Sequence, residues 1–154
     1  MIEKANICDH ELLTQITQRS KAYWGYSNEQ MEIWKDLLTI TTTYLATKEA
    51  FKLTIGHEVI GYYSFYSEND DVIRLDNLFL LPEFIGKGFG KLLMNDFLQR
   101  VRNTNAKSVI LDSEPFAEKF YAHFGFVKTG QLETLIKNRH LPIMELKLSV
   151  YTSL

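Results

Sequence analysis

One stretch of the sequence decides the fold: Leu78-Phe79-Leu80-Leu81-Pro82-Glu83-Phe84-Ile85-Gly86-Lys87-Gly88-Phe89-Gly90-Lys91-Leu92-Leu93-Met94. An apolar run stops at a proline, three alternating glycines follow, and an amphipathic pattern begins, which predicts a strand, a tight turn and a helix. The first N–H groups of a helix have no intrahelical partner and lie at its positive end. Glycines let a phosphate approach the backbone closely, so the stretch predicts an anion site. The alternative is a turn in which glycine only relieves strain.

The glycine pattern differs from two well-known phosphate-binding loops. A P-loop needs a second glycine after four intervening residues, and Lys91 stands there. The dinucleotide fingerprint needs G-x-G-x-x-G, whereas this chain has G-x-G-x-G over Gly86–Gly90. Neither ATP-type nor dinucleotide binding is therefore predicted.

The segment Ile85–Gly90 resembles the acyl-coenzyme A loop of the GNAT acetyltransferase superfamily, whose pattern is Gln/Arg-x-x-Gly-x-Gly/Ala. Gly88 and Gly90 match, and Ile85 stands where the family usually has Gln or Arg. In the family, backbone amides of this loop hold the pyrophosphate. The resemblance therefore implies a coenzyme A site made by Ile85, Gly86, Lys87, Gly88, Phe89, Gly90 and Lys91. The two lysines add charge-assisted contacts in this interpretation, and are solvated surface residues in the alternative.

A second segment, Phe116–Phe126, looks like the family's later motif Ala-x-x-Phe-Tyr-x-x-x-Gly-Phe. It matches at Ala117, Phe120, Tyr121, Gly125 and Phe126. The two motifs together imply one GNAT-like α/β domain over residues 1–154, with a mixed, mostly antiparallel sheet of six to seven strands flanked by about four helices. Glu114 departs from the asparagine that many members place there against the pantetheine arm.

Composition is that of an ordinary globular domain. The chain has 154 residues, a net charge of −2 and one cysteine, Cys8, so we expect one domain, no internal disulfide and no extended nucleic-acid face. The N-terminus lacks a signal-peptide pattern, and no apolar run is long enough to span a bilayer. A cytoplasmic protein without membrane or nucleic-acid partners is the expectation. Cys8 is expected to be buried or half-buried.

Apolar spacing and turn residues predict the remaining elements. Asp9 and Ser27 are predicted N-caps of the first two helices, and the second helix carries apolar residues as far as Leu38. A hairpin turn is expected at Gly56-His57. Other predicted elements are strands at Ile2–Cys8, Ala50–Ile55, Val59–Phe65, Val72–Leu81, Ser108–Leu111, from Phe126 and at Leu141–Leu148, a short helix at Tyr44–Lys48, a helix after the glycines with Leu92 facing inward, and one from Pro115 to about His123. The later part of Val72–Leu81 is expected to be buried on both faces, and the last strand to offer an exposed edge for a possible homodimer.

The resemblance also implies the catalytic parts. The pantetheine arm adds along Leu78, Phe79 and Leu80 like a strand, and the N–H of Leu78 or Phe79 polarises the acetyl oxygen. Tyr121 stands at the family's general-acid position, where a phenol can protonate the departing thiolate. The alternative for Tyr121 is a ring that only packs in the core.

The general base is a separate question. Asp76 lies on the strand before the glycines and is the predicted base or amine anchor, or else makes a structural hydrogen bond. Glu114, near the end of the next strand, is a second carboxylate candidate and a predicted substrate contact. No His, Cys or Asp spacing indicates a metal site.

The acceptor site is expected in the variable front of the domain. Four residues between the first two helices are candidates, because aromatic rings beside a cleft can hold a cation or a flat substrate: Lys21, Tyr23, Trp24 and Tyr26. The alternative is that Trp24 and Tyr26 only fill the space between helices.

The resulting hypothesis is an N-acetyltransferase that moves an acetyl group from acetyl-CoA, its co-substrate, to a primary amine of a small molecule or peptide. Attack is direct, in a ternary complex, since Cys8 is far in sequence from both motifs. A non-catalytic coenzyme A-binding sensor or partner module of the same fold is the alternative. A third possibility is a phosphate- or nucleotide-binding domain unrelated to acyl transfer.

Overall fold

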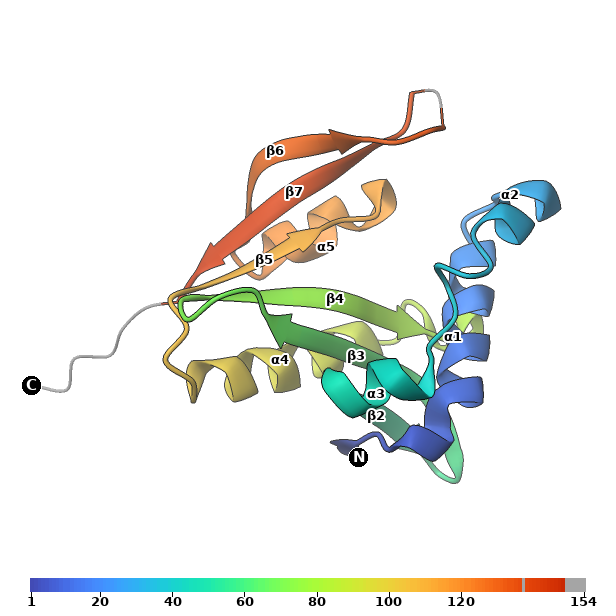
Figure 1. Ribbon diagram of the computed structural model, residues 1–154, viewed down its shortest axis with the longest axis horizontal. Helices are drawn as coiled ribbons and strands as arrows, with labels where there is room; N and C mark the ends of the chain where they lie inside the picture. Colours follow the sequence, from blue (N-terminus) through green and yellow to red (C-terminus); the bar gives the residue numbers. More distant parts are fainter. Residues whose placement is uncertain (137, 149–154) are drawn as a thin grey trace, which may run out of the picture. The chain divides into compact units, whose positions relative to one another are not determined.

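The computed structural model describes residues 1–136 and 138–148. Within them the chain forms seven strands and five α-helices, so the predicted α/β class is confirmed (Figure 1). The elements are β1 Ile2–Lys4, α1 His10–Ala22, α2 Asn28–Ile33, α3 Thr42–Thr47, β2 Glu49–Ile55, β3 Glu58–Ser67, β4 Val72–Leu80, α4 Phe89–Arg102, β5 Ser108–Asp112, α5 Glu118–His123, β6 Val127–Glu133 and β7 His140–Lys147. Short 3-10 helices span Ile7–Asp9, Pro82–Phe84 and Pro115–Ala117.

The strands follow the order β1-β2-β3-β4-β5-β7-β6. Strands β4 and β5 pair in parallel, whereas β1–β2, β2–β3, β5–β7 and β6–β7 are antiparallel. A mixed, mostly antiparallel sheet was therefore correctly predicted. The exposed edge expected on the last strand was wrong, because β6 folds back along β7 and covers it, leaving β6 as the outer strand.

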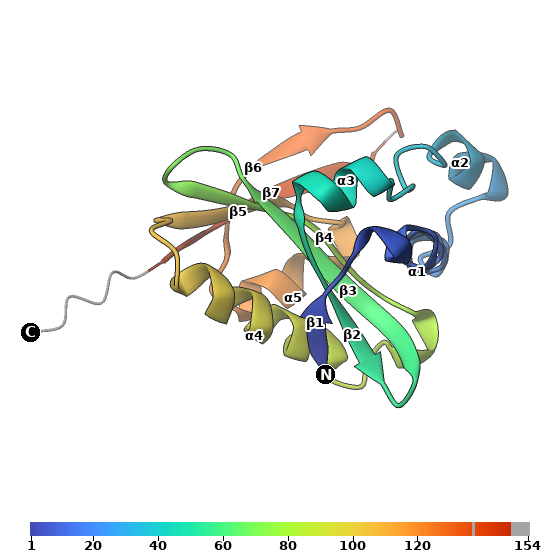
Figure 2. The ribbon, with the colours of Figure 1, turned by 60° about the horizontal axis from the view of Figure 1, so that its bottom comes forward.

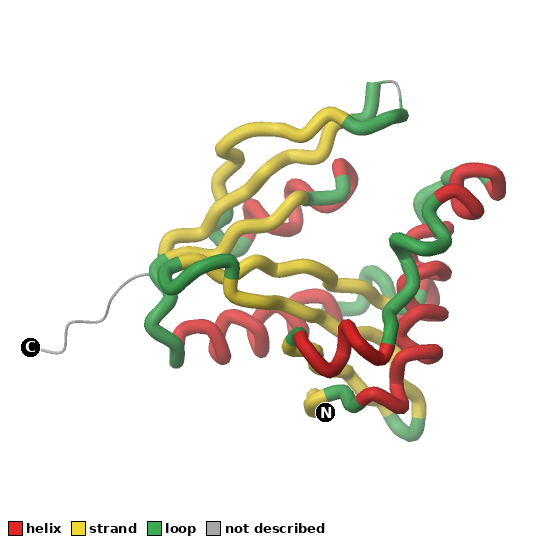
Figure 3. Tube along the Cα trace, viewed as in Figure 1, coloured by secondary structure: helices red, strands yellow, loops and turns green. Residues whose placement is uncertain are grey.

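The chain divides into two compact units. The first comprises Met1–Phe65 and Asn77–Gln99, and the second comprises Tyr66–Asp76 and the chain from Arg100 onward. Each unit contains both strands and helices. Figure 3 colours the strands yellow and the helices red along the chain. The single acetyltransferase domain over residues 1–154 stays a prediction.

The first unit packs helices on both faces of β2 and β3 (Figure 2). Because successive strand residues face opposite sides, Tyr62 joins a core with residues of α1 and α3, while Tyr63 meets Phe97 of α4 with ring centroids 5.5 Å apart. Both tyrosine hydroxyls are hydrogen-bonded, to Thr17 at 2.5 Å and to Asp96 at 2.6 Å. Both rings are therefore buried without leaving a hydroxyl group that lacks a hydrogen bond.

The second unit has its own antiparallel layer of β5, β7 and β6, in which Leu111 pairs with Met144 and both are buried. Helix α5 ends where Gly125 adopts a φ of 97°, the left-handed conformation in which glycine commonly follows the last residue of a helix. Phe126 then turns back, and its N–H donates to the carbonyl of Tyr121 at 3.3 Å. This turn connects α5 to β6.

Of the two helix N-caps predicted from the sequence, Ser27 is confirmed and Asp9 is wrong. Ser27 caps α2 as expected, since its Oγ accepts from the Gln30 N–H at 3.0 Å. Asp9 precedes α1, but its carboxylate makes no side-chain cap there and accepts instead from the Asn6 N–H at 2.9 Å and from Lys52 at 3.0 Å. Asn6 caps the 3-10 turn Ile7–Asp9 and ends β1 early, so Cys8 is exposed and its predicted burial was wrong.

Three further expectations, two of burial and one of the length of a helix, were wrong. On α4, Leu92 is 45% exposed and Met94 is fully buried, because the inward stripe runs one residue further round the helix than expected. Helix α2 ends at Ile33, which is 72% exposed. On β4, Leu78 and Phe79 are only partly buried.

Gly61 allows β3 to approach β4 closely. The β2–β3 register shifts between Leu53 and Thr54, opposite Gly61 and Val59, so one extra residue is accommodated there. A Cβ at Gly61 would lie 2.7 Å from the carbonyl oxygen of Phe79 and 2.6 Å from Leu80 Cδ2. Only glycine fits at this position without moving β4.

Gly61→Ala is therefore expected to lower the free energy of unfolding by about 1–3 kcal/mol, the usual cost of overpacking a close contact. Thermal or urea unfolding of the purified variant measures this. Gly130→Ala is the matched control, because its Cβ would meet Ile143 at an ordinary 3.6 Å. Equal stability of both variants would contradict the close approach.

Candidate functional site

The glycine turn has the backbone geometry of an open anion cradle. Gly86 and Gly88 adopt φ values of 81° and 88°, a region that strains other residues. Apart from the adjoining residues, no atom of residues 1–136 and 138–148 lies within 4 Å of where a Cβ would stand at either glycine. Helix α4 begins at the next residue, Phe89, so its first N–H groups follow the turn directly. The glycines are needed for conformation, and the space beside them is open.

The turn is held from both sides. Before it, Glu83 receives a hydrogen bond from Arg19 of α1 at 2.6 Å. Across it, the rings of Phe84 and Phe89 meet at 5.8 Å, and the Lys87 ammonium lies 5.8 Å from the Phe84 ring centroid. These contacts form within the protein itself. The conformation of the turn is therefore held without a bound ligand.

The charge pattern of α4 favours an anion at its start. The first turn carries no acidic residue, and Arg100 and Arg102 lie in the last turn. This distribution complements the helix dipole and adds no repulsion to a phosphate at the N-terminus. Lys87 and Lys91 are exposed beside the turn.

Strand β4, which leads into the glycine turn, continues beyond the residues that pair with β5. The parallel register joins Val72–Arg74 to Ser108–Ile110. The predicted cofactor-binding residues Leu78, Phe79 and Leu80 lie beyond that section of β4. Their assignment to the pantetheine arm stays a prediction.

In the second unit, Tyr121 lies on α5 with its side chain 9% exposed. Its ring packs edge-on against Phe120 at 5.2 Å and Phe126 at 5.8 Å. Burial raises the pKa of the Tyr121 phenol, and the Glu114 carboxylate raises it further. The phenol therefore keeps its proton throughout the ordinary pH range, the state that a general acid needs.

Glu114 forms an ion pair with an arginine that no sequence motif marks. Arg139 Nη2 lies 2.8 Å from Glu114 Oε2, and the two side chains are only 11% and 15% exposed. Thr134 Oγ1 donates to the Arg139 carbonyl at 2.9 Å, which closes the segment before β7. Glu114, a predicted substrate contact, thus already has a cationic partner inside the protein.

Arg139→Met is expected to cost about 1.5–3 kcal/mol of unfolding free energy, because it removes a charged hydrogen bond from a mostly buried carboxylate. Chemical denaturation measures this. Lys4→Met is the matched control, since the exposed Lys4–Glu49 pair at 3.3 Å should contribute about 0–1 kcal/mol. A similar small loss in both variants would contradict this assignment.

Asp76, the predicted base, is exposed on β4. Burial raises the pKa of the nearby Tyr66 phenol, and the negative charge of Asp76 adds to that rise. Asp76 therefore stands beside a neutral hydroxyl. Its role as base stays a prediction.

The four predicted acceptor residues form two contacts, at the last turn of α1 and just after it. The Lys21 ammonium lies 5.5 Å from the Tyr26 ring centroid and 5.0 Å from that of Trp34, a residue the sequence did not single out. Tyr23 and Trp24 pack edge-on at 5.0 Å. The Tyr26 and Trp34 faces thus already hold an internal cation.

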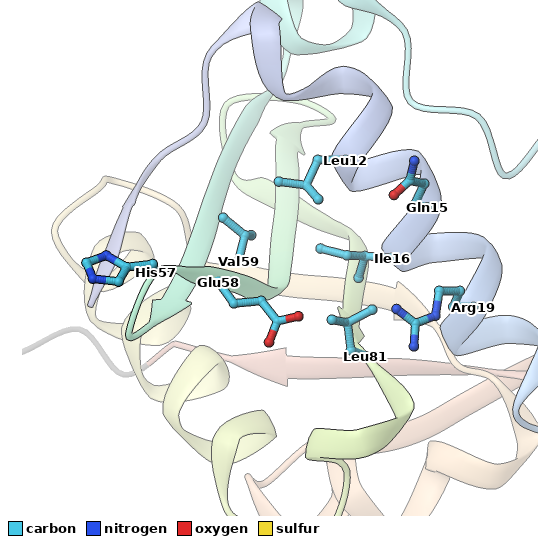
Figure 4. A pocket seen from close by; sticks show the side chains of 8 residues that line it. All are labelled: Leu12, Gln15, Ile16, Arg19, His57, Glu58, Val59 and Leu81. Carbon is cyan, nitrogen blue, oxygen red and sulfur yellow. The ribbon is translucent and has the colours of Figure 1, made fainter.

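A pocket of about 530 Å³ lies between α1 and the β2–β3 turn (Figure 4). It is lined by Leu12, Gln15, Ile16, Arg19, His57, Glu58, Val59 and Leu81. None of the residues predicted for the site lines it. In the described part of the chain, no cluster of three or more potential metal ligands occurs, and no helix is long and apolar enough to cross a membrane.

Comparison with known families identifies the fold. The model of the acetyltransferase (GNAT) domain matches residues 25–148. The chain belongs to the GNAT acetyltransferase family. The match includes the glycine turn, Asp76 and the Tyr121 motif, so the resemblance stated from these motifs is confirmed at the level of the family.

Individual GNAT relatives are distant. The chain is 27% identical over 77 residues to the uncharacterized N-acetyltransferase ycf52 of Pyropia yezoensis, a match covering 50% of this chain and 44% of that protein. It is 25% identical over 146 residues to the [ribosomal protein bS18]-alanine N-acetyltransferase of Haemophilus influenzae, covering 92% and 88%. The matched part thus spans under half the length of the first of these relatives.

Among solved structures, the chain is similar to the PaiA N-acetyltransferase of Thermoplasma acidophilum in complex with coenzyme A. The TM-score is 0.80 at 20% identity, covering 96% of this chain and 98% of that one. This likeness supports the GNAT fold. Cofactor binding by this chain is a separate question.

Proposed function

We propose that this GNAT protein is an acetyl-CoA-dependent N-acetyltransferase acting on a primary amine of a small molecule or peptide. The observation that carries the proposal is the open glycine turn at the start of α4, with Gly86 and Gly88 in left-handed conformations and empty space beside both. Backbone amides at a helix N-terminus suit a pyrophosphate. The relatives named N-acetyltransferases and the coenzyme A complex of the Thermoplasma protein support it.

In the proposed reaction, the amine nitrogen attacks the thioester carbonyl carbon and the carbon–sulfur bond breaks. An N–H of Leu78 or Phe79 polarises the carbonyl oxygen. Tyr121 gives its phenolic proton to the departing thiolate. The attacking nitrogen passes its proton to Asp76. Attack is direct within a ternary complex.

The cofactor contacts divide between backbone and side chains. The amides of Gly86–Lys91 would bind the pyrophosphate, and Lys87 and Lys91 would add charge. Lys21, Tyr23, Trp24, Tyr26 and Glu114 remain the proposed acceptor contacts. A cytoplasmic location and a possible homodimer, now through an edge other than β7, belong to the same proposal.

Calorimetric titration with acetyl-CoA and with S-acetylpantetheine, which lacks the pyrophosphate, tests the cofactor site. Micromolar binding of acetyl-CoA that weakens strongly for S-acetylpantetheine is the expected result. Absence of acetyl-CoA binding at millimolar concentration would overturn the proposal. Binding without turnover on any amine would indicate the non-catalytic sensor instead.

A further inference from the structure

Three polar side chains from three elements of the first unit form a closed triangle. Asn77 Nδ2 lies 2.9 Å from Ser64 Oγ and 3.2 Å from Tyr44 Oη, and the two hydroxyl oxygens lie 2.8 Å apart. Tyr44 comes from α3, Ser64 from β3 and Asn77 from β4. Ser64 is fully buried, so the triangle fixes the Asn77 amide in one orientation.

The triangle leaves one strong acceptor unused. Both hydrogens of the Asn77 amide nitrogen are directed to hydroxyl oxygens. In residues 1–136 and 138–148, Asn77 Oδ1 receives no hydrogen bond from the protein, and no buried side-chain oxygen or nitrogen lacks a partner. Since Asn77 is only partly buried, its Oδ1 is therefore open to a ligand.

The position of this oxygen along the chain suggests its ligand. Asn77 directly precedes Leu78 and Phe79, the residues whose N–H groups are proposed to polarise the acetyl carbonyl. An amide oxygen accepts from an N–H without carrying a charge. We propose that Asn77 Oδ1 accepts a hydrogen bond from the acceptor amine and orients its lone pair, with Tyr44 and Ser64 as positioning residues. This inference rests on the proposed acetyltransferase function.

A neutral anchor has a specific advantage in this reaction. The amine attacks only when it has lost its extra proton. A carboxylate in contact would stabilise the ammonium and raise its pKa, whereas an amide oxygen binds the N–H with a much smaller effect on that equilibrium. One titratable group, the Tyr44 phenol of the triangle, lies 3.2 Å from Asn77 Nδ2, and Asp76 directly precedes Asn77 in the sequence.

Steady-state kinetics of three variants test the proposal. Asn77→Ala should raise the amine KM about tenfold while leaving acetyl-CoA affinity unchanged. Asn77→Asp can keep the triangle, because both hydroxyls can donate to a carboxylate. This variant should shift the acidic limb of the plot of kcat against pH to higher pH by about one unit or more, because the carboxylate raises the pKa of the bound amine. Tyr44→Phe should raise the amine KM severalfold by loosening the amide.

Tyr63→Phe is the matched control, since it also deletes a β3–α4 hydrogen bond of a buried tyrosine, to Asp96 at 2.6 Å. Its amine KM and pH profile should stay at the wild-type values. Wild-type transfer together with an unchanged amine KM in Asn77→Ala, or an unmoved limb in Asn77→Asp, would overturn this inference alone. Absence of transfer by the wild type would overturn the proposed function and this inference with it.

Discussion

Tyr121→Phe is expected to lower kcat by about 10²- to 10⁴-fold, the usual contribution of a positioned general acid. The phenol is buried and its pKa is raised by burial and by Glu114, so it carries its proton at neutral pH. The acetyl-CoA dissociation constant should stay near the wild-type value, because the ring is retained. Steady-state kinetics and calorimetry together separate the two quantities.

Tyr62→Phe provides the matched control for this variant. It also removes a buried hydroxyl that is hydrogen-bonded to Thr17, and should cost stability without a comparable loss of kcat. Wild-type turnover in Tyr121→Phe would remove Tyr121 as the general acid. Tyr121 would then be a core residue, whose ring packs against Phe120 and Phe126.

Gly88→Asp is expected to weaken acetyl-CoA binding by about tenfold or more. It places a negative charge where the pyrophosphate should lie and strains a backbone with a φ of 88°. Loss of even one charged hydrogen bond is worth about 1.5–3 kcal/mol. Calorimetric titration measures the dissociation constant, and thermal unfolding checks the fold.

Gly56→Asp is the matched control, because it adds the same charge and a similar strain outside the glycine turn. Gly56, in the β2–β3 turn, also has a left-handed φ of 63° and nothing within 4 Å of its would-be Cβ. This variant should lose similar stability and keep wild-type affinity for acetyl-CoA. Equal affinities in the two variants would show that the glycine turn does not bind the cofactor.

Features set by neighbouring residues were predictable from the sequence. The hairpin turn at Gly56-His57, the Ser27 cap and the strand–turn–helix order around Gly86–Gly88 follow from backbone preferences that act over a few residues. The resemblance carried by that turn and by the Tyr121 motif led to the family, which the match over residues 25–148 confirms.

Features set by distant contacts were not predictable. Arg139 reaches Glu114 across 25 residues of sequence, and no local pattern marks either as a pair. The Asn77 triangle joins residues up to 33 positions apart, and the close approach at Gly61 depends on the register shift of β2. Such contacts depend on which strands become neighbours, which local propensity does not encode.

Transfer of an isotopically labelled acetyl group tests the central claim most directly. The purified protein is incubated with labelled acetyl-CoA and a panel of primary amines that includes small molecules and peptide N-termini, and products are read by mass spectrometry. Amine-dependent appearance of label on nitrogen is the predicted result. Gly88→Asp should reduce it when acetyl-CoA is below saturation, and Tyr121→Phe should slow it strongly. Tight acetyl-CoA binding with no labelled amine across the panel would contradict the account.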